Sequence, residues 1–312
     1  MPKISVVIPC YKVRDTIAAT LHSIAMQSII DETEIVIVND CDGIDYSDIL
    51  TKFGDLNIKY VVNPENRGCG GARNTGIRNA TGDFICFVDS DDQLSCSLSL
   101  EVMYNTIVKG ELDMLATTFE SEGRFTDGIA IKKMEHTPTW CHGRLYRRQY
   151  LIDNNLFFNE NLRLNEDAEF HQILFDLGAK VGEIPMVTLT WRDNPKSLTH
   201  ESLYKNKLTF VDACMEYIKD CEKRGLMNER VVVRVVQNLD VIYAYYNIVL
   251  DEHEDKAGEF LARCRDYWQL CKDIVADVDD EMATRVYLAV MKDFKSIPSV
   301  GYIEFLNELR AD

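Results

Sequence analysis

Residues 84–92 read Phe-Ile-Cys-Phe-Val-Asp-Ser-Asp-Asp, a short apolar run that ends in a cluster of acidic side chains. An uninterrupted apolar run of this length is typical of a strand that is buried on both faces of a sheet. Carboxylates that gather at a strand end repel one another, and a bound cation relieves that repulsion. Oxygen ligands suit Mg²⁺ or Mn²⁺, which usually bind together with substrate phosphates. The alternative role for the cluster is an acidic N-cap for the following helix.

Upstream of this strand, strand patterns alternate with helix patterns. Strand-like runs occur at residues 4–8, 34–38 and 58–62, and helical spacing at residues 15–27, 49–53 and 73–79. This alternation predicts a mostly parallel sheet that is covered by helices on both faces, an α/β fold of the Rossmann-like kind. Such sheets bind ligands at the carboxyl ends of their strands, where Pro9, Tyr11, Asp40 and the acidic cluster all fall.

The last hundred residues have a different character. Helical spacing recurs at residues 203–223, 229–250, 256–275, 281–294 and 302–310. We therefore expect an α/β domain over residues 1–203 and an all-helical region over residues 204–312. Wide apolar faces in the helical region favour packing against the first domain. A homodimer interface is the alternative.

Composition limits the partners of this protein. The chain has 34 Lys and Arg against 51 Asp and Glu, a net charge of −17. An acidic balance argues against a nucleic-acid coat protein and against an anionic membrane surface as main partner. No apolar stretch approaches the ~20 residues that span a bilayer. None of the ten cysteines forms a Cys-x-x-Cys pair, so reduced thiols in the cytoplasm are expected.

Three further segments carry candidate chemistry. The glycine-rich segment 66–76 lets the backbone approach an anion, and its Arg73 suits a pyrophosphate; a flexible turn is the alternative. Glu166-Asp167 opens a helical pattern and offers a general base beside a partner acid, or only a favourable charge at a helix start. The segment 191–200 offers Arg192, Ser197 and His200 to a diphosphate or a metal ion.

The order of these pieces is more specific than any one of them. Pro9-x-Tyr11, Asp40, Asn66-x-Gly68 with Ala72-Arg73-Asn74-x-Gly76, the acidic cluster 89–92 and Glu166-Asp167 together resemble the family 2 glycosyltransferases over roughly residues 3–200. The segment 143–148 is similar to that family's Lys-Leu-Tyr-Arg-Arg stretch, and residues 192–200 to its closing segment. One departure is the segment 39–43, Asn-Asp-Cys-Asp-Gly, where the family usually has Asp-Asp-Gly-Ser.

The resemblance implies the GT-A fold and inverting transfer of a sugar from a nucleotide-diphospho-sugar, commonly a UDP-sugar, with Mn²⁺ or Mg²⁺. It implies that Pro9, Tyr11 and Asp40 hold the nucleobase, and that Asn66 and Arg73 complete the nucleoside and diphosphate pocket. Asp89 would contact the ribose or the sugar, and Asp91 would hold the metal ion. Asp167 would be the catalytic base with Glu166 beside it. Arg192, Ser197 and His200 would close over the diphosphate, with His200 reaching the metal ion.

Two other functions stay open on the sequence. A nucleotidyltransferase shares the nucleotide-binding sheet, but it would carry a glycine-rich basic loop after the first strand, where residues 9–14 have no glycine. A non-catalytic sugar-nucleotide-binding module would have lost its carboxylates, yet Glu166-Asp167 and the acidic cluster are both present. The acceptor hydroxyl is not specified: a glycan, a lipid-linked sugar, a protein side chain and a modified nucleobase all fit.

Overall fold

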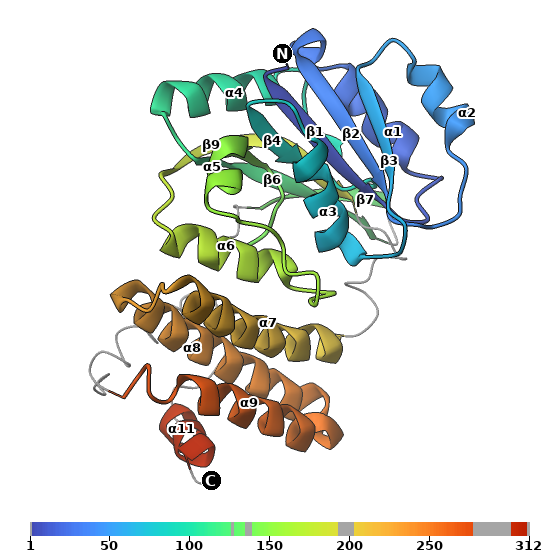
Figure 1. Ribbon diagram of the computed structural model, residues 1–312. Coiled ribbons are helices and arrows are strands. Elements are labelled where there is room, and N and C mark those ends of the chain that lie inside the picture. Colours follow the sequence, from blue (N-terminus) through green and yellow to red (C-terminus); the bar gives the residue numbers. More distant parts are fainter. Residues whose placement is uncertain (1, 126–127, 135–138, 193–202, 277–300, 311–312) are drawn as a thin grey trace. The chain divides into compact units, whose positions relative to one another are not determined.

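The structure is a computed structural model that describes residues 2–125, 128–134, 139–192, 203–276 and 301–310 (Figure 1). The chain divides into two compact units. The first comprises Met1–Leu174 and Gly178–Ser197, and the second comprises Phe175–Leu177 and Leu198–Asp312. All the described strands lie in the first unit, which we call the sheet unit, and the second is the helical unit.

One mixed sheet organises the sheet unit. Its described strands are β1 (Ile4–Cys10), β2 (Thr33–Asn39), β3 (Ile58–Val62), β4 (Phe84–Phe87), β5 (Gln93–Leu94), β6 (Met114–Phe125), β7 (Gly128–Met134), β8 (Arg144–Arg147) and β9 (Val181–Arg192). They follow the order β3-β2-β1-β4-β8-β6-β9-β5, and β7 pairs with β6. The first four strands pair in parallel, as the strand and helix alternation predicts. Beyond them the sheet is mixed, because β8 joins β4 in the antiparallel direction.

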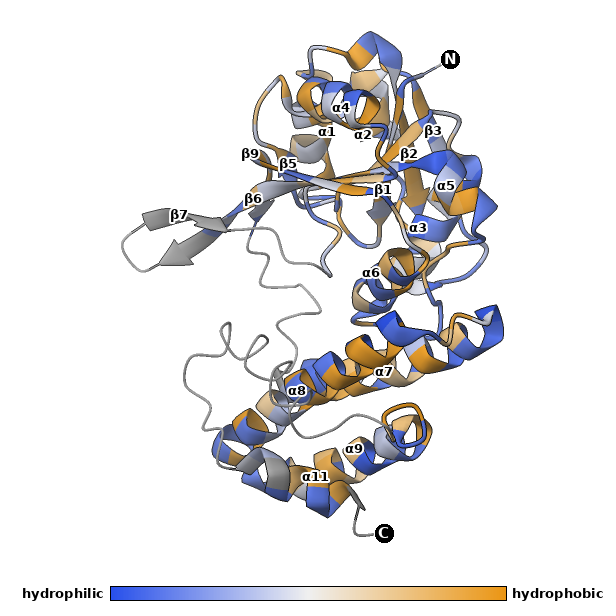
Figure 2. Cartoon of the chain, turned by 90° about the vertical axis from the view of Figure 1, so that its left-hand side faces the viewer, coloured by the Kyte–Doolittle hydropathy of each residue, from blue (hydrophilic) through white to orange (hydrophobic). Residues whose placement is uncertain are grey.

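Helices cover both faces of this sheet. They are α1 (Ile17–Ala25), α2 (Ser47–Leu50), α3 (Gly68–Asn79), α4 (Ser99–Gly110), α5 (Arg148–Asp153) and α6 (Glu166–Asp176), with the short 3-10 helices η1 (Ile30–Glu32) and η2 (Thr51–Phe53). Figure 2 shows α1 and α4 on one side of the strands and α3 on the other. Successive strand residues point to opposite faces, so Val6 joins a core with Leu21 of α1, whereas Val7 meets Gly76 of α3. The predicted α/β class is therefore confirmed.

The glycine-rich segment differs from the expectation of a turn followed by a helix over residues 73–79. Helix α3 already begins at Gly68. The Asp40 carboxylate accepts hydrogen bonds from the backbone N–H groups of Arg67 and Gly68, which have no partner inside the helix. Close packing also needs glycine here, because a Cβ at Gly76 would collide with the Val7 side chain. The glycines therefore serve helix packing as well as backbone access.

The helical unit contains α7 (Leu203–Arg224), α8 (Glu229–Glu252), α9 (Ala257–Cys271) and α11 (Tyr302–Arg310), with the 3-10 helix η4 (Glu254–Lys256). These helices match four of the five predicted helical segments. The fifth, at residues 281–294, lies outside the described residues. Helices α7, α8 and α9 contact one another, and their apolar stripes are visible in Figure 2. Buried thiols at Cys214, Cys221, Cys264 and Cys271 form part of this core, and all ten cysteines of the chain are free.

Candidate active site

The candidate site lies at the carboxyl ends of β1, β2 and β4. Cys10 is in register with Asn39, and the backbone N–H of Asp40 donates to the Cys10 carbonyl at 2.8 Å. On the other side of β1, the Val88 N–H donates to the Val7 carbonyl at 3.1 Å. The parallel register therefore brings Asp40 and the acidic cluster to the same edge of the sheet, as the sequence predicts. At this edge Pro9 is buried, whereas the Tyr11 side chain is 47% exposed and accessible to a ligand.

Asp40 connects the end of β2 to the start of α3. One carboxylate oxygen accepts a hydrogen bond from Asn63 Nδ2 at 2.8 Å, and the other accepts the Gly68 N–H at 2.8 Å. Asn66 donates from Nδ2 to the Asp40 carbonyl at 3.3 Å, and its Oδ1 accepts from Arg163 at 2.8 Å. Asp40 is 2% exposed, so it holds the walls of the site in register.

Arg73 is the central charge of the site. Its guanidinium donates to Asp89 Oδ1 at 2.9 Å and to Glu166 Oε1 at 2.7 Å, and the residue is only 4% exposed. It therefore joins α3, the end of β4 and the start of α6. Burial would raise the pKa of Asp89, but the charges of Arg73 and His142 outweigh burial and hold that pKa below its usual value. Arg73 is thus already paired on two sides, which favours a positioning role over the direct diphosphate contact that the resemblance implies.

Glu166 and Asp167 form the first turn of α6. Burial and repulsion from Asp167 raise the pKa of Glu166 to about 7. Burial also raises the pKa of Asp167, although Arg73 and His142 oppose it. The buried His171 fixes this turn, because its Nδ1 lies 2.7 Å from the Asp167 carbonyl oxygen and its Nε2 lies 2.8 Å from the hydroxyl of Tyr146.

His142 is a site residue that the sequence reasoning missed. Its Nε2 lies 3.3 Å from Asp92 Oδ2 and 3.7 Å from Asp89 Oδ2. The antiparallel register pairs Cys86 with Leu145, so the residues before β8 continue alongside the residues after β4. A single histidine far from the acidic cluster in sequence gives no local signal. Only the pairing of β4 with β8, which the sequence patterns did not predict, brings the two together.

The sequence gives Asp92 no role of its own within the acidic cluster, but in the structure it is the most buried carboxylate of that cluster. The residue is 0% exposed, and burial raises its pKa to about 6. Its Oδ1 accepts a hydrogen bond from the Arg192 backbone N–H at 3.0 Å. The Arg192 side chain turns instead to Glu122, 3.1 Å away. Asp91 is half-buried beside this carboxylate and adds to its negative surroundings.

Two predicted residues, Ser197 and His200, lie outside the described residues. Within the described residues, one group of three side chains could hold a metal ion: Asp89, Asp92 and His142, whose ligand atoms all lie within 4.8 Å of one another. Asp92 Oδ2 is buried without an aligned hydrogen-bond donor. Carboxylate oxygens with one imidazole nitrogen are suitable ligands for a divalent cation, so the residues of this edge fit the metal that the fold family implies.

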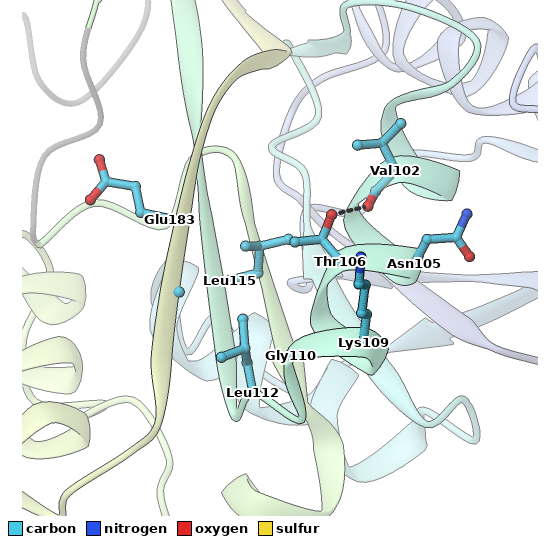
Figure 3. A pocket seen from close by; sticks show the side chains of 9 residues that line it. Val102, Asn105, Thr106, Lys109, Gly110, Leu112, Leu115 and Glu183 are labelled. Carbon is cyan, nitrogen blue, oxygen red and sulfur yellow. Dashed lines mark hydrogen bonds between the residues drawn. The ribbon is translucent and has the colours of Figure 1, made fainter.

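A separate hollow of about 590 Å³ lies at the opposite edge of the sheet (Figure 3). It is lined by α4 and by the first residues of β6 and β9, among them Lys109, Leu112 and Glu183. Phe84, the first residue of β4, is in register with Arg147, and Met114, the first residue of β6, is in register with Tyr146. The start of β6, which lines the hollow, therefore lies near the amino end of β4. The hollow is therefore distinct from the edge where the carboxylates converge.

The sheet is mixed, with its first four strands parallel, acidic side chains at their carboxyl ends and a second carboxylate pair on the later helix α6; this is the arrangement that the resemblance to the GT-A fold implies. The sequence matches the family described as "Glycosyl transferase family 2" over residues 5–161. The chain therefore belongs to glycosyltransferase family 2, and its fold is GT-A with a helical C-terminal region.

Named relatives and solved structures agree with this assignment. The chain is 29% identical over 220 residues to the uncharacterized glycosyltransferase EpsJ of Bacillus subtilis, which covers 64% of this chain and 63% of that protein. It is 30% identical over 183 residues to the poly(ribitol-phosphate) beta-N-acetylglucosaminyltransferase TarS of Staphylococcus aureus. This alignment covers 54% of this chain and 32% of TarS. The crystal structure of S. aureus TarS 1-349 in complex with UDP-GlcNAc superposes with a TM-score of 0.69 at 21% identity, covering 94% of this chain and 88% of that one.

The chain spans less than two thirds of the length of several curated relatives: 63% of EpsJ, 38% of the glycosyltransferase GlyA of Streptococcus pneumoniae and 33% of the minor teichoic acid biosynthesis protein GgaB of Bacillus subtilis. Among the helices that the structure describes, none combines the length and the apolar character needed to cross a membrane.

Proposed function

We propose that this chain transfers a sugar from a nucleotide-diphospho-sugar to an acceptor hydroxyl, with inversion at the anomeric carbon. Membership of family 2 supports the reaction class. The observation that carries the proposal is the pair of contacts made by Arg73, which joins Asp89 of the acidic cluster to Glu166, the neighbour of Asp167. A donor-binding carboxylate and the residue next to the candidate base are thus paired with the same guanidinium.

In this proposal the donor lies along the carboxyl edge of the sheet. Pro9, Tyr11 and Asp40 hold the nucleobase end, and the exposed ring of Tyr11 supports a stacking contact there. Asn66 stands on the diphosphate side, and Asp89 faces the ribose or the sugar. The description of TarS as a complex with UDP-GlcNAc supports a UDP-sugar as the donor here.

The rest of the donor pocket would be closed by Arg192, Ser197 and His200. Asp91, with His200, would hold Mn²⁺ or Mg²⁺, an ion that when bound neutralises negative charge on the departing diphosphate. The two ion pairs of Arg73 give it the further task of fixing Asp89 and Glu166 in place.

The chemistry requires a base, because an acceptor hydroxyl has a pKa far above 7. Asp167 takes the hydroxyl proton while the acceptor oxygen bonds to the anomeric carbon and the bond from that carbon to the diphosphate oxygen breaks. Attack on the face opposite the diphosphate inverts the configuration. A well-placed base contributes about 10²–10⁴ in rate. Glu166, with a pKa of about 7, carries a proton in part of the population at neutral pH, which limits its repulsion of Asp167.

The names of the relatives narrow the class of acceptor that we propose. TarS and GgaB are named for poly(ribitol-phosphate) and minor teichoic acid, and EpsJ is named only as a glycosyltransferase. These names support a hydroxyl on a growing polymer or a lipid-linked sugar over a protein side chain or a nucleobase.

A thermal-shift screen of UDP-, GDP-, CDP- and TDP-sugars, each with and without Mn²⁺, tests the donor. The true donor stabilises the folded protein by mass action and raises the melting temperature. Absence of a shift with all of these sugar nucleotides would contradict the proposal only together with absent transfer, so release of nucleoside diphosphate is measured in the same samples.

Asp167→Asn tests the base. We expect donor binding to stay within about twofold of wild type while turnover falls by about 10²–10⁴, the range for a general base. The matched control is Asp31→Asn, because Asp31 is exposed in η1 at the amino end of β2. Full turnover in Asp167→Asn would remove this residue from the base role. Proton NMR of the product reports whether the anomeric configuration has inverted.

A further inference from the structure

The loops that follow β1 and β2 meet at the carboxyl edge of the sheet, and one carboxylate joins them. Asp42 Oδ2 accepts the backbone N–H of Lys12 at 2.8 Å and the hydroxyl of Tyr46 at 2.6 Å. Its Oδ1 accepts Asn39 Nδ2 at 2.9 Å and the Ile44 N–H at 2.8 Å. One side chain of the loop after β2 therefore binds the loop after β1.

These four hydrogen bonds fill the carboxylate of Asp42. An ionised carboxylate offers about four lone-pair sites, and each oxygen here accepts two hydrogen bonds. Burial would raise the pKa of Asp42, but the hydrogen bonds outweigh burial and hold that pKa below its usual value. The group is therefore charged at neutral pH and is fully engaged by protein donors. This favours a role in holding the loops over a direct contact with a ligand.

Asp42 is also where this chain departs from the family pattern. Residues 39–43 read Asn-Asp-Cys-Asp-Gly, so Asp42 stands at the place of the serine in the usual Asp-Asp-Gly-Ser. A serine hydroxyl is shorter, carries no charge and accepts at most two hydrogen bonds. The family pattern therefore does not predict a link of this kind between the two loops.

The link holds the residue next to Tyr11 in a conformation that non-glycine residues rarely adopt. Lys12 has a φ of +57°, and such a conformation persists where surrounding contacts impose it. Its N–H is held by Asp42. The next N–H, of Val13, donates to the hydroxyl of the buried Tyr46 at 3.2 Å, and that hydroxyl donates in turn to Asp42. Both N–H groups that follow Tyr11 are thus fixed through Asp42.

The orientation of the Tyr11 ring depends on this held segment. The ring is exposed at the sheet edge, and the Lys12 ammonium lies over it, 5.0 Å from the ring centre. One face of the ring is therefore occupied by a cation, and the other is available to a flat ligand.

We propose that Asp42 is a positioning residue for the nucleobase of the donor: by fixing Lys12, it sets the orientation of the Tyr11 ring on which the base stacks. This inference rests on the proposed function, which assigns Tyr11 to the nucleobase end. It adds a residue that acts through Tyr11 and is specific to this chain.

Isothermal titration calorimetry of the full chain with UDP tests the proposal. Asp42→Ala removes all four acceptor contacts. The loop then spends less time in the competent conformation, and because apparent affinity falls with the competent fraction, we expect UDP to bind at least about fivefold more weakly. Asp45→Ala is the matched control, because Asp45 is exposed in the same loop and its carboxylate accepts from the nearby Ser47. Equal UDP affinity in Asp42→Ala and Asp45→Ala would overturn the proposal.

A double-mutant cycle with Tyr11→Ala separates positioning from a general loss of structure. Because Asp42 acts through Tyr11, we expect Asp42→Ala to cost much less UDP affinity in the Tyr11→Ala background than in wild type. Equal losses in both backgrounds would refute the positioning role. Tyr46→Phe covers the case in which Asp42→Ala fails to fold, since it removes only a hydroxyl; we expect about two- to fivefold weaker UDP binding, and wild-type affinity would then count against the link.

Steady-state kinetics provide a second readout. For the sugar nucleotide that raises the melting temperature most, we expect Asp42→Ala to raise KM and to leave kcat within about twofold of wild type, because the catalytic carboxylates are unchanged. A lower kcat with an unchanged KM would contradict the proposal and leave the proposed function intact. Wild-type UDP affinity in Tyr11→Ala, or no UDP binding by wild type, would overturn the assigned nucleobase end and this inference together.

Discussion

Removal of the Arg73 guanidinium tests the architecture of the site most directly. Arg73→Met keeps much of the aliphatic length of the side chain but leaves Asp89 and Glu166 without their shared cation. Breaking a buried pair from one side costs about 3–5 kcal/mol, because a charge is left buried and uncompensated. Glu166 is 7% exposed, so water compensates little of this loss. We expect Arg73→Met to destabilise the protein by an amount within that range at pH 8.

The loss must depend on pH, with a sign that follows from Glu166. Its pKa is about 7, raised from 4.5, so the folded state favours its neutral form. A carboxyl whose pKa is raised by folding contributes stability that is fully present below pH 4.5, its ordinary pKa. That stability is lost as the pH rises through about 7, the pKa in the folded state. Arg73 opposes that rise, and without it the pKa of Glu166 increases further. The deficit of Arg73→Met relative to wild type should therefore be larger at pH 8 than at pH 5.5, by about 1–2 kcal/mol.

Urea unfolding followed by tryptophan fluorescence measures this deficit, since Trp140 and Trp191 lie in the sheet unit. The control is Arg78→Met on the exposed side of the same helix, where we expect a loss below about 1 kcal/mol. Adding Glu166→Gln to Arg73→Met should recover part of the loss at pH 8, because a neutral amide needs no counter-charge. A loss in Arg73→Met no larger than in Arg78→Met, or a deficit that is the same at both pH values, would refute this prediction.

Two predictions concern stability elsewhere in the chain. Burial raises the pKa of Asp240 in α8 from 3.8 to about 7, so Asp240→Asn should stabilise the protein by up to about 4 kcal/mol at pH 8 and by less at pH 5.5; calorimetry checks this, and the exposed Asp251→Asn should show neither effect. Gly76→Ala should destabilise the protein by about 1–3 kcal/mol because its Cβ collides with Val7, whereas Gly258→Ala in α9 meets open space and should gain up to about 1 kcal/mol. Equal melting temperatures for the two alanine variants would contradict the packing argument.

The ion pairs of Arg73 show which features of the site the family resemblance predicts and which it does not. The family pattern predicts Arg73, Asp89 and Glu166 at one site, and the structure places the Arg73 side chain in contact with both carboxylates. It could not indicate that Arg73 would be 4% exposed and already bound to both carboxylates. The cytoplasmic location and a homodimer through the helical region stay predictions.

The sequence by itself determined the elements with strong local signals. Buried strands such as β1 and β4 are continuous apolar runs, and long helices such as α7 and α8 have sustained helical spacing, so both can be read from neighbouring residues. The parallel arrangement of the first four strands followed from their alternation with helices, and with it the edge where Asp40 meets the acidic cluster.

Only the tertiary structure decided which distant residues join that edge. The antiparallel pairing of β8 with β4 sets His142 against Asp92, and no periodicity in the sequence records which strand lies beside β4. Likewise, α3 begins at Gly68 because the Asp40 carboxylate, which follows the end of β2, accepts hydrogen bonds from the Arg67 and Gly68 N–H groups. Helix and strand formation depends on residues that are neighbours along the chain. The environment of a buried charge depends instead on residues that are distant in sequence and that folding brings next to it.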